Sequence, residues 1–310
     1  MRFAILGSGS KGNSLVIEGG GRTILIDCGY SPKETKRRLA ALDVDITAID
    51  ALLITHGHGD HTKGAKQLAG SLGIPTYATE ETKRFCAGFT GLKNHVPISS
   101  QHEFKLGGLT VRPQATPHDA PGSVCFVVDD GDEAFGVCTD LGVPALPIAR
   151  ALSVCTALVL EHNHDADMLQ TGPYNAALKR RIASPRGHLS NVAGAQLLDM
   201  AMRFSPGTLT RVLLAHLSEV NNTPALALAA ARPFVDGKDI ELAIAPQHHP
   251  TGWLKVRRTR THATPPVHAP PQPLAHAPPV QPPPAPPPPA GRHVALQRQL
   301  TLFAATTRAT

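Results

Sequence analysis

Cysteine pairs, long apolar runs and acidic residues near the carboxyl end are all missing from this sequence of 310 residues. Its five cysteines form an odd, scattered set without a CxxC pair, which favours reduced thiols in a cytosol. No apolar run is long enough to span a bilayer, and Met1-Arg2 leads directly into a short strand instead of a secretory signal. We therefore expect a cytoplasmic protein that makes no contact with a membrane.

The lack of acidic residues is confined to the end of the chain. From Lys255 onward there are seven basic side chains and no acidic ones, whereas the first 254 residues carry 23 basic and 24 acidic side chains. The net charge of +6 therefore comes from the tail. A basic tail favours a nucleic-acid partner because it attracts phosphate, although a solvated, disordered segment would have the same composition.

A nucleotide-binding P-loop is also missing. The glycine-rich loop Gly7–Ser14 follows a predicted strand, Arg2–Leu6, but no GK[ST] sequence ends it. A second strand, Leu15–Ile17, comes next instead of a helix, and a glycine turn leads to a third, Thr23–Ile26. The loop thus allows the backbone to approach another group closely, but the sequence of the loop does not identify that group.

What the sequence does contain is a dense group of metal-capable side chains directly after an apolar strand, Ala51–Ile54: His56, His58, Asp60 and His61. Residues two apart on an extended segment point the same way, so one segment could hold two adjacent ions. Three imidazoles and a carboxylate suit Zn²⁺, and the carboxylate also suits Mn²⁺ and iron, so the cluster alone does not fix the metal.

Helices are predicted on both sides of this cluster. Ser31-Pro32-Lys33-Glu34 is a capping box that opens a helix to about Leu42, and Thr62–Leu72 is expected to form a second helix. Strand, ligand loop and helix alternate, which is typical of a layered α/β fold. Three further candidates, each just beyond a predicted strand, could converge on the same site: His118, Asp140 and His216.

The order HxHxDH, then histidine, aspartate and histidine, resembles the metallo-β-lactamase fold family, and it implies an αββα sandwich. By this resemblance one divalent ion is held by His56, His58 and His118 and a second by Asp60, His61 and His216, with Asp140 between them. Asp27, at the end of the third strand, would support the metal loop from behind. Because true β-lactamases of this fold generally have cysteine at the position of Asp140, phosphoester hydrolysis is favoured over antibiotic hydrolysis.

Later segments resemble particular members of the family. Ribonuclease Z has a similar order, which implies that His188 is a general acid and Glu161 its partner. The YycJ/WalJ group, regarded as 5′–3′ DNA exonucleases, matches over roughly residues 1–250, including 7–14, 161–165, 172–182, 187–191 and 215–218. Three basic residues in segment 172–182 suit phosphate contacts but equally suit a solvated helix face: Lys179, Arg180 and Arg181. A fourth candidate, His164, could contact the substrate or be structural.

The chain beyond residue 254 differs in character. Fourteen prolines between Pro265 and Pro289 cannot bury a core, so 255–298 is predicted to be a disordered, partly stiff linker. It leads to a short peptide that resembles the sliding-clamp-binding peptide of bacterial replication and repair proteins, followed by a disordered end at 304–310. The anchors of the clamp-like peptide would be Gln299, Leu300, Leu302 and Phe303.

Together these features predict a metal-dependent hydrolase domain at 1–254 with two divalent ions, Zn or Mn. The favoured function is DNA exonuclease action in repair or replication, tethered to the sliding clamp, with Asp60 and His188 in the catalytic machinery. RNA processing and cleavage of a small cyclic phosphate remain open because the same ligands would serve them. A clamp-tethered binding module with weak or no catalysis is the alternative from another class.

Overall fold

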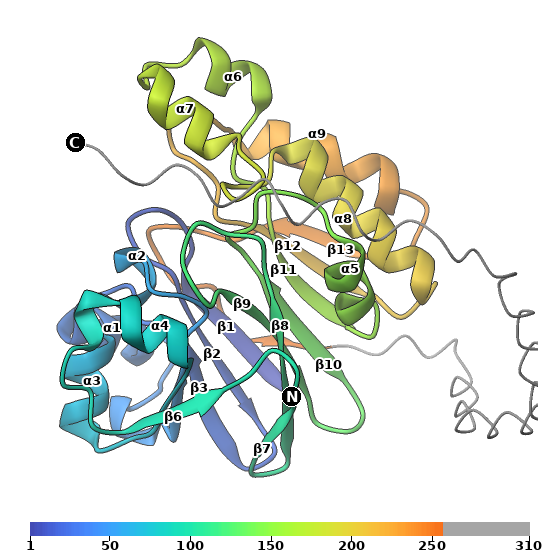
Figure 1. Cartoon of the computed structure of the whole chain (residues 1–310). Coiled ribbons are helices and arrows are strands. Elements are labelled where there is room, and N and C mark those ends of the chain that lie inside the picture. Colours follow the sequence, from blue (N-terminus) through green and yellow to red (C-terminus); the bar gives the residue numbers. More distant parts are fainter. Residues whose placement is uncertain (257–310) are drawn as a thin grey trace, which may run out of the picture. The chain divides into compact units, whose positions relative to one another are not determined.

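The structure is a computed structural model that describes residues 1–256. Most of the predicted linker and the whole clamp-like peptide lie outside the described residues. Within residues 1–256 the strands form two seven-stranded mixed sheets (Figure 1). The first sheet has the order β14-β1-β2-β3-β4-β5-β6. Its strands are β1 (Arg2–Gly7), β2 (Ser14–Gly19), β3 (Arg22–Ile26), β4 (Ala51–Leu53), β5 (Thr76–Thr79), β6 (His95–Ile98) and β14 (Leu254–Lys255).

The second sheet has the order β13-β12-β11-β10-β9-β8-β7. Its strands are β7 (Phe104–Leu106), β8 (Leu109–Ala115), β9 (Val124–Asp129), β10 (Ala134–Cys138), β11 (Ala157–Glu161), β12 (Arg211–Ala215) and β13 (Glu241–Ile244). Strands β10 to β13 run parallel to one another. Their carboxyl ends therefore meet at one edge of the sheet.

Helices cover the outer faces of both sheets (Figure 1). The first sheet is covered by α1 (Pro32–Ala40), α3 (Ala65–Leu72) and α4 (Glu80–Phe85), and the second by α5 (Leu146–Leu152), α8 (Asn191–Phe204) and α9 (Pro224–Val235). Shorter elements are α2 (Gly59–Thr62), α6 (Ala166–Thr171), α7 (Ala176–Ile182), and the 3₁₀ turns η1 (Ile46–Ala48) and η2 (Ala87–Phe89).

Alternation along β1 explains the layering. Phe3 and Ile5 belong to the core between the sheets, whereas Ala4 and Leu6 belong to the core beneath α1 and α3. Successive side chains of a strand point to opposite faces, so a strand that is apolar throughout is covered on both sides. A third apolar core lies between the second sheet and α5, α8 and α9. The expected αββα sandwich is confirmed.

Two local predictions differ from the structure. The helix predicted over Thr62–Leu72 is two helices, α2 and α3, because α2 begins at Gly59 within the metal motif and Gly64 separates the two. The strand β14 was not predicted, since Leu254 and Lys255 follow a polar loop without alternation. Strand β14 pairs with β1, and Val256 beyond it is buried.

Candidate metal centre

All seven predicted ligands lie at one edge of the sandwich. His56, His58, Asp60 and His61 follow β4, while His118, Asp140 and His216 follow β8, β10 and β12. Ligand atoms within 4.8 Å of one another form overlapping groups. Two of these groups are the expected sets, His56 with His58 and His118, and Asp60 with His61 and His216. A third joins Asp140 to His56 and His61, so Asp140 lies between the two sets.

Each buried imidazole binds the protein through one ring nitrogen and turns the other toward the shared space. His61 Nδ1 lies 2.7 Å from Asp27 Oδ2, His216 Nδ1 lies 3.1 Å from Glu161 Oε1, and His118 Nδ1 lies 3.0 Å from the carbonyl oxygen of Gly187. Such contacts fix the ring orientation and the tautomer of metal ligands. The remaining Nε2 atoms are thereby directed at one another and at Asp60 and Asp140.

The residues fit a pair of divalent cations. Within residues 1–256, the Nε2 atoms of His56 and His216 are buried and make no hydrogen bond. Buried polar atoms normally have a partner, and a group without one needs an explanation such as an ion. Imidazole nitrogens and carboxylate oxygens together are the donors that Zn²⁺ accepts, and the carboxylates also suit Mn²⁺.

The backbone at the site is held in an uncommon conformation. Asp27, Asp140 and His216 have positive φ angles of 58°, 62° and 55°. Non-glycine residues rarely adopt this left-handed region, and such strain gathers at functional sites. Gly29 shows how tightly the loops pack, because a Cβ there would lie 1.7 Å from the carbonyl oxygen of Asp60.

The carboxylates dominate the electrostatics of the centre. Burial opposes protonation of His216, but Asp140, Asp60 and Glu161 outweigh it and raise its pKa to about 10. Burial raises the pKa of Asp140, but His216, His61 and His56 outweigh it and hold that pKa well below its ordinary value. Histidine must be deprotonated at the nitrogen that ligates a metal, so metal binding at such a centre releases protons.

Glu161 connects the metal ligands to His188. Its Oε1 lies 2.8 Å from His188 Nδ1 and 3.1 Å from His216 Nδ1, and its Oε2 accepts from the backbone N–H groups of Leu141 and Leu189. Burial raises the pKa of Glu161, but His188 and His216 outweigh it and lower the pKa to about 2. The sequence associated Glu161 with His188 alone, and the structure places it against His216 as well.

Asp27 lies behind the motif, as expected. Its carboxylate accepts from the backbone N–H and the hydroxyl of Thr55, and its Oδ2 lies against His61.

Sequence reasoning missed Asp119. Its Oδ1 lies 3.3 Å from His58 Nε2 and 3.5 Å from His118 Nε2, and its Oδ2 accepts from Arg181 Nε at 2.5 Å. Its position directly after His118 could have signalled its role.

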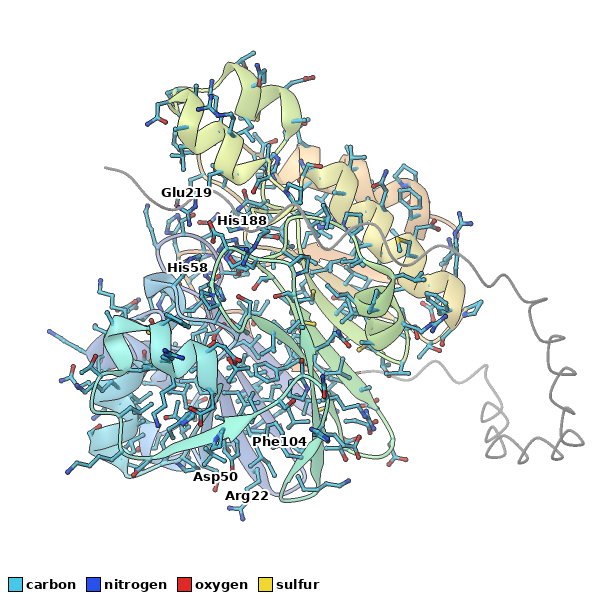
Figure 2. All side chains as sticks on the ribbon, in the orientation of Figure 1. Arg22, Asp50, His58, Phe104, His188 and Glu219 are labelled. Carbon is cyan, nitrogen blue, oxygen red and sulfur yellow. The ribbon has the colours of Figure 1, made fainter. Side chains whose placement is uncertain are left out.

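The candidate phosphate contacts are not all brought to the centre. Arg181 lines a pocket beside His188, while the ammonium of Lys179 donates to the carbonyl of Gln170 and Arg180 is exposed. His164 is 4% exposed and lies outside the lining of this pocket. Figure 2 labels His58 and His188 near one another, beneath the projecting helices α6 and α7 of Figure 1.

The site and the fold define a metal-dependent hydrolase. The chain belongs to the metallo-β-lactamase superfamily, whose family profile matches residues 7–188. Two curated relatives are similar over most of their length. Exodeoxyribonuclease WalJ from Streptococcus pneumoniae is 33% identical over 73% of this chain and 85% of its own. Exodeoxyribonuclease YycJ from Bacillus anthracis is 30% identical over 81% of this chain and 95% of its own.

Solved structures share the fold at much lower identity. YhfI from Bacillus subtilis has a TM-score of 0.63 at 16% identity and covers 81% of this chain and 98% of its own. The short form of human tRNase Z has a TM-score of 0.56 at 16% identity, with coverage of 81% and 99%. Within residues 1–256, none of the helices combines the length and apolar character needed to cross a membrane.

Proposed function

We propose that this protein is a two-metal phosphodiesterase that acts as a 5′–3′ DNA exonuclease in repair or replication. The observation that carries the proposal is the convergence of seven candidate ligands and the His188–Glu161 pair at one edge of the sandwich. The similarity to curated exodeoxyribonucleases over most of their length supports DNA as the substrate. Asp140 in place of a cysteine supports a phosphoester over a β-lactam.

In this proposal His56, His58 and His118 would hold one ion, Asp60, His61 and His216 would hold the other, and Asp140, which lies between the two sets, would supply a carboxylate to the centre. The ions, Zn or Mn, supply Lewis acidity that activates water and neutralises charge developing on the phosphate. Asp27 and Glu161 orient His61 and His216 through their Nδ1 atoms and so direct the opposite nitrogens to the ions.

His188 holds the proton that the leaving oxygen needs. Its Nδ1 lies 2.8 Å from Glu161 Oε1, which fixes the ring and leaves Nε2 for the substrate. When the bond between phosphorus and the 3′ oxygen breaks, His188 protonates that oxygen. Expulsion of an unprotonated alkoxide is thereby avoided, a benefit typically worth about 10²- to 10⁴-fold in rate.

The test is digestion of end-labelled single- and double-stranded DNA, and of matched RNA, by the full-length protein with Zn²⁺ or Mn²⁺. We expect metal-dependent release of nucleotides from the 5′ end of DNA, abolished by Asp60→Ala and reduced by His188→Ala. Cleavage of RNA or a cyclic phosphate while DNA stays intact would contradict the DNA assignment. Binding of DNA without metal-dependent cleavage would favour the clamp-tethered binding module.

We also propose that the chain has a hydrolase domain followed by a linker to residue 298 and a sliding-clamp-binding peptide at 299–303, and that it works in the cytoplasm. The domain reaches two residues past the expected boundary at 254, because Lys255 lies in β14 and Val256 is buried. The described cysteines are all free and buried, which supports a reducing compartment. In the full-length protein, Leu302→Ala with Phe303→Ala should abolish capture by the purified bacterial sliding clamp while exonuclease activity on free DNA is retained. Equal capture of wild type and variant would refute the clamp peptide.

A further inference from the structure

A pocket of about 170 Å³ lies beside the metal centre. One part of its lining belongs to the chemistry already described, because Asp119 and His188 contribute to it. A second part comes from α7 and the residues before it, through Tyr174, Leu178 and Ile182, and the remaining lining residues are small or polar. The pocket is therefore lined both by residues beside the metal centre and by apolar side chains of α7.

Helix α7 is unusual because none of its residues is buried. Leu178 and Ile182 are four residues apart, so they lie on the same face of the helix, and both are half-buried. This apolar face therefore lines the pocket and does not enter the cores of the sandwich. The volume is of the order of that of a cavity of about 150 Å³ that binds benzene, so a single base has room against this face.

Arg181 brings a positive charge to the same pocket. Its Nε donates to Asp119 Oδ2, and within residues 1–256 its two terminal nitrogens make no hydrogen bond. The side chain of Arg181 is 58% exposed, so it is accessible to a ligand. A guanidinium that is fixed at one nitrogen and free at two others matches the geometry of a phosphate.

We propose that this pocket binds the departing 5′-terminal nucleotide of a DNA strand, with its base against Leu178 and Ile182 and its 5′-phosphate on Arg181. The inference rests on the proposed exonuclease function. It follows from the position of His188, because the group that protonates the departing 3′ oxygen also lines the pocket. The nucleotide attached to that oxygen must therefore lie there.

The reaction balances as a hydrolysis. The oxygen of a water molecule bonds to phosphorus, and the bond from phosphorus to the 3′ oxygen breaks. His188 gives its proton to that oxygen, and the proton lost by the water restores His188. The products are a 5′-mononucleotide, with its base in the pocket and its phosphate on Arg181, and a DNA strand with a new 5′-phosphate.

The test compares four variants of the full-length, Mn²⁺-loaded protein, one of which, Arg180→Ala, removes the neighbouring exposed arginine of α7. Arg181→Ala removes the phosphate contact, Leu178→Trp fills the pocket from a residue outside the core, and Arg203→Ala removes a 76% exposed arginine of α8 as a control. The substrates are single-stranded DNA with a 5′-phosphate, the same DNA with a 5′-hydroxyl, and bis(p-nitrophenyl) phosphate, which carries no nucleotide. Thymidine 5′-monophosphate serves as a competitive inhibitor.

We expect Arg181→Ala to raise KM for 5′-phosphorylated DNA at least tenfold and to remove the preference over the 5′-hydroxyl end. Leu178→Trp should raise KM at least tenfold for both DNA substrates. Arg203→Ala should hydrolyse both DNA substrates and bis(p-nitrophenyl) phosphate within twofold of wild type. Both pocket variants should lose more activity on DNA than on bis(p-nitrophenyl) phosphate, and they should resist thymidine 5′-monophosphate at least tenfold more than Arg203→Ala does.

KM values for DNA equal to that of Arg203→Ala would overturn the pocket proposal. An equal loss of activity on all substrates would also overturn it, because it would show that these residues act in the chemical step. An effect of Arg180→Ala as large as that of Arg181→Ala would indicate a diffuse basic surface instead. Wild-type protein that hydrolyses bis(p-nitrophenyl) phosphate but not DNA would refute the exonuclease function, and the pocket proposal with it.

Discussion

At the scale of single residues, each buried histidine of the candidate centre contacts a supporting group with one ring nitrogen and turns the other toward the space between the ligands. Thr55, Asp27 and Glu161 are buried groups that orient histidines, and the histidines in turn face one another across the shared space. Burying so many polar groups is costly unless each has partners. The arrangement is thus stabilised by the same contacts that would aim the ligands at the ions.

A substitution at Asp27 tests this orienting role, because Asp27 contacts His61 but is not itself a predicted metal ligand. Asp27→Asn should keep the left-handed backbone, since asparagine tolerates positive φ, but it should weaken the contact to His61. Metal affinity should fall about 10- to 100-fold. The measurement is competition for Zn²⁺ against a fluorescent chelator. Asp43→Asn is the matched control, because Asp43 also has a positive φ, 57°, but is exposed. Equal affinity of both variants would exclude the role.

The roles of His188 and Glu161 can be told apart by two measurements, the dependence of activity on the leaving group and the metal content of the protein. His188→Ala should lower kcat on DNA about 10²- to 10⁴-fold. It should have little effect on bis(p-nitrophenyl) phosphate, whose leaving group needs no proton. Glu161→Gln should lower both metal content and activity on both substrates, because Glu161 also orients His216. If His188→Ala affects the two substrates equally, it is not the acid.

The residues of the centre were largely predictable because HxHxDH and the later strand-end residues form an ordered motif in the sequence. Asp119 was not, since a lone aspartate after a histidine has many possible roles. Its contact with Arg181 joins positions 62 residues apart, which no local pattern reveals.

At the scale of elements, the short helix α2 is packed by backbone contacts against the loop after β3 and the loop after β1. The N–H of Cys28 donates to the carbonyl of His61, and the N–H of Asn13 donates to the carbonyl of Asp60. Gly29 lies at this contact without room for a side chain. Sequence periodicity predicted one helix from Thr62 because these contacts, which fix α2 ahead of Gly64, are distant in sequence.

Gly29→Ala should therefore displace the metal loop. We expect a loss of about 2–4 kcal/mol in the free energy of unfolding and a loss of bound metal, because the new Cβ would meet the carbonyl of Asp60. Gly59→Ala, within the motif itself, should be tolerated, since nothing lies within 4 Å of a Cβ there. Urea unfolding and metal analysis of both variants provide the measurement. Equal tolerance of the two changes would contradict the packing described.

Helix α1 gives a pH-dependent contribution away from the centre. Hydrogen bonds from Arg37 and Arg38 outweigh partial burial and lower the pKa of Glu34 to about 2. Because the folded pKa is depressed, this stabilisation is present above the ordinary value of 4.5 and is lost as pH falls toward 2. Glu34→Gln should cost about 1 kcal/mol at pH 7 and almost nothing at pH 2. Urea unfolding of the metal-free proteins measures it, and a cost independent of pH would refute the ion pair.

At the scale of the whole hydrolase unit, the centre exists because two sheets meet. The four ligands after β4 belong to the first sheet, and those after β8, β10 and β12 belong to the second. The layer order was predictable from strands that are apolar on both faces. The pairing of β14 with β1 was not, because a two-residue strand carries no periodic signal.

The most direct measurement is the metal content of the purified full-length protein, compared with Asp140→Asn. Asparagine keeps the left-handed backbone at this position but is a much poorer ligand than a carboxylate. We predict two ions, Zn or Mn, per wild-type chain and fewer than one in the variant, because Asp140 lies between both ligand sets. Wild-type protein that binds one ion or none at saturating metal, or a variant that retains two, would contradict the two-ion centre.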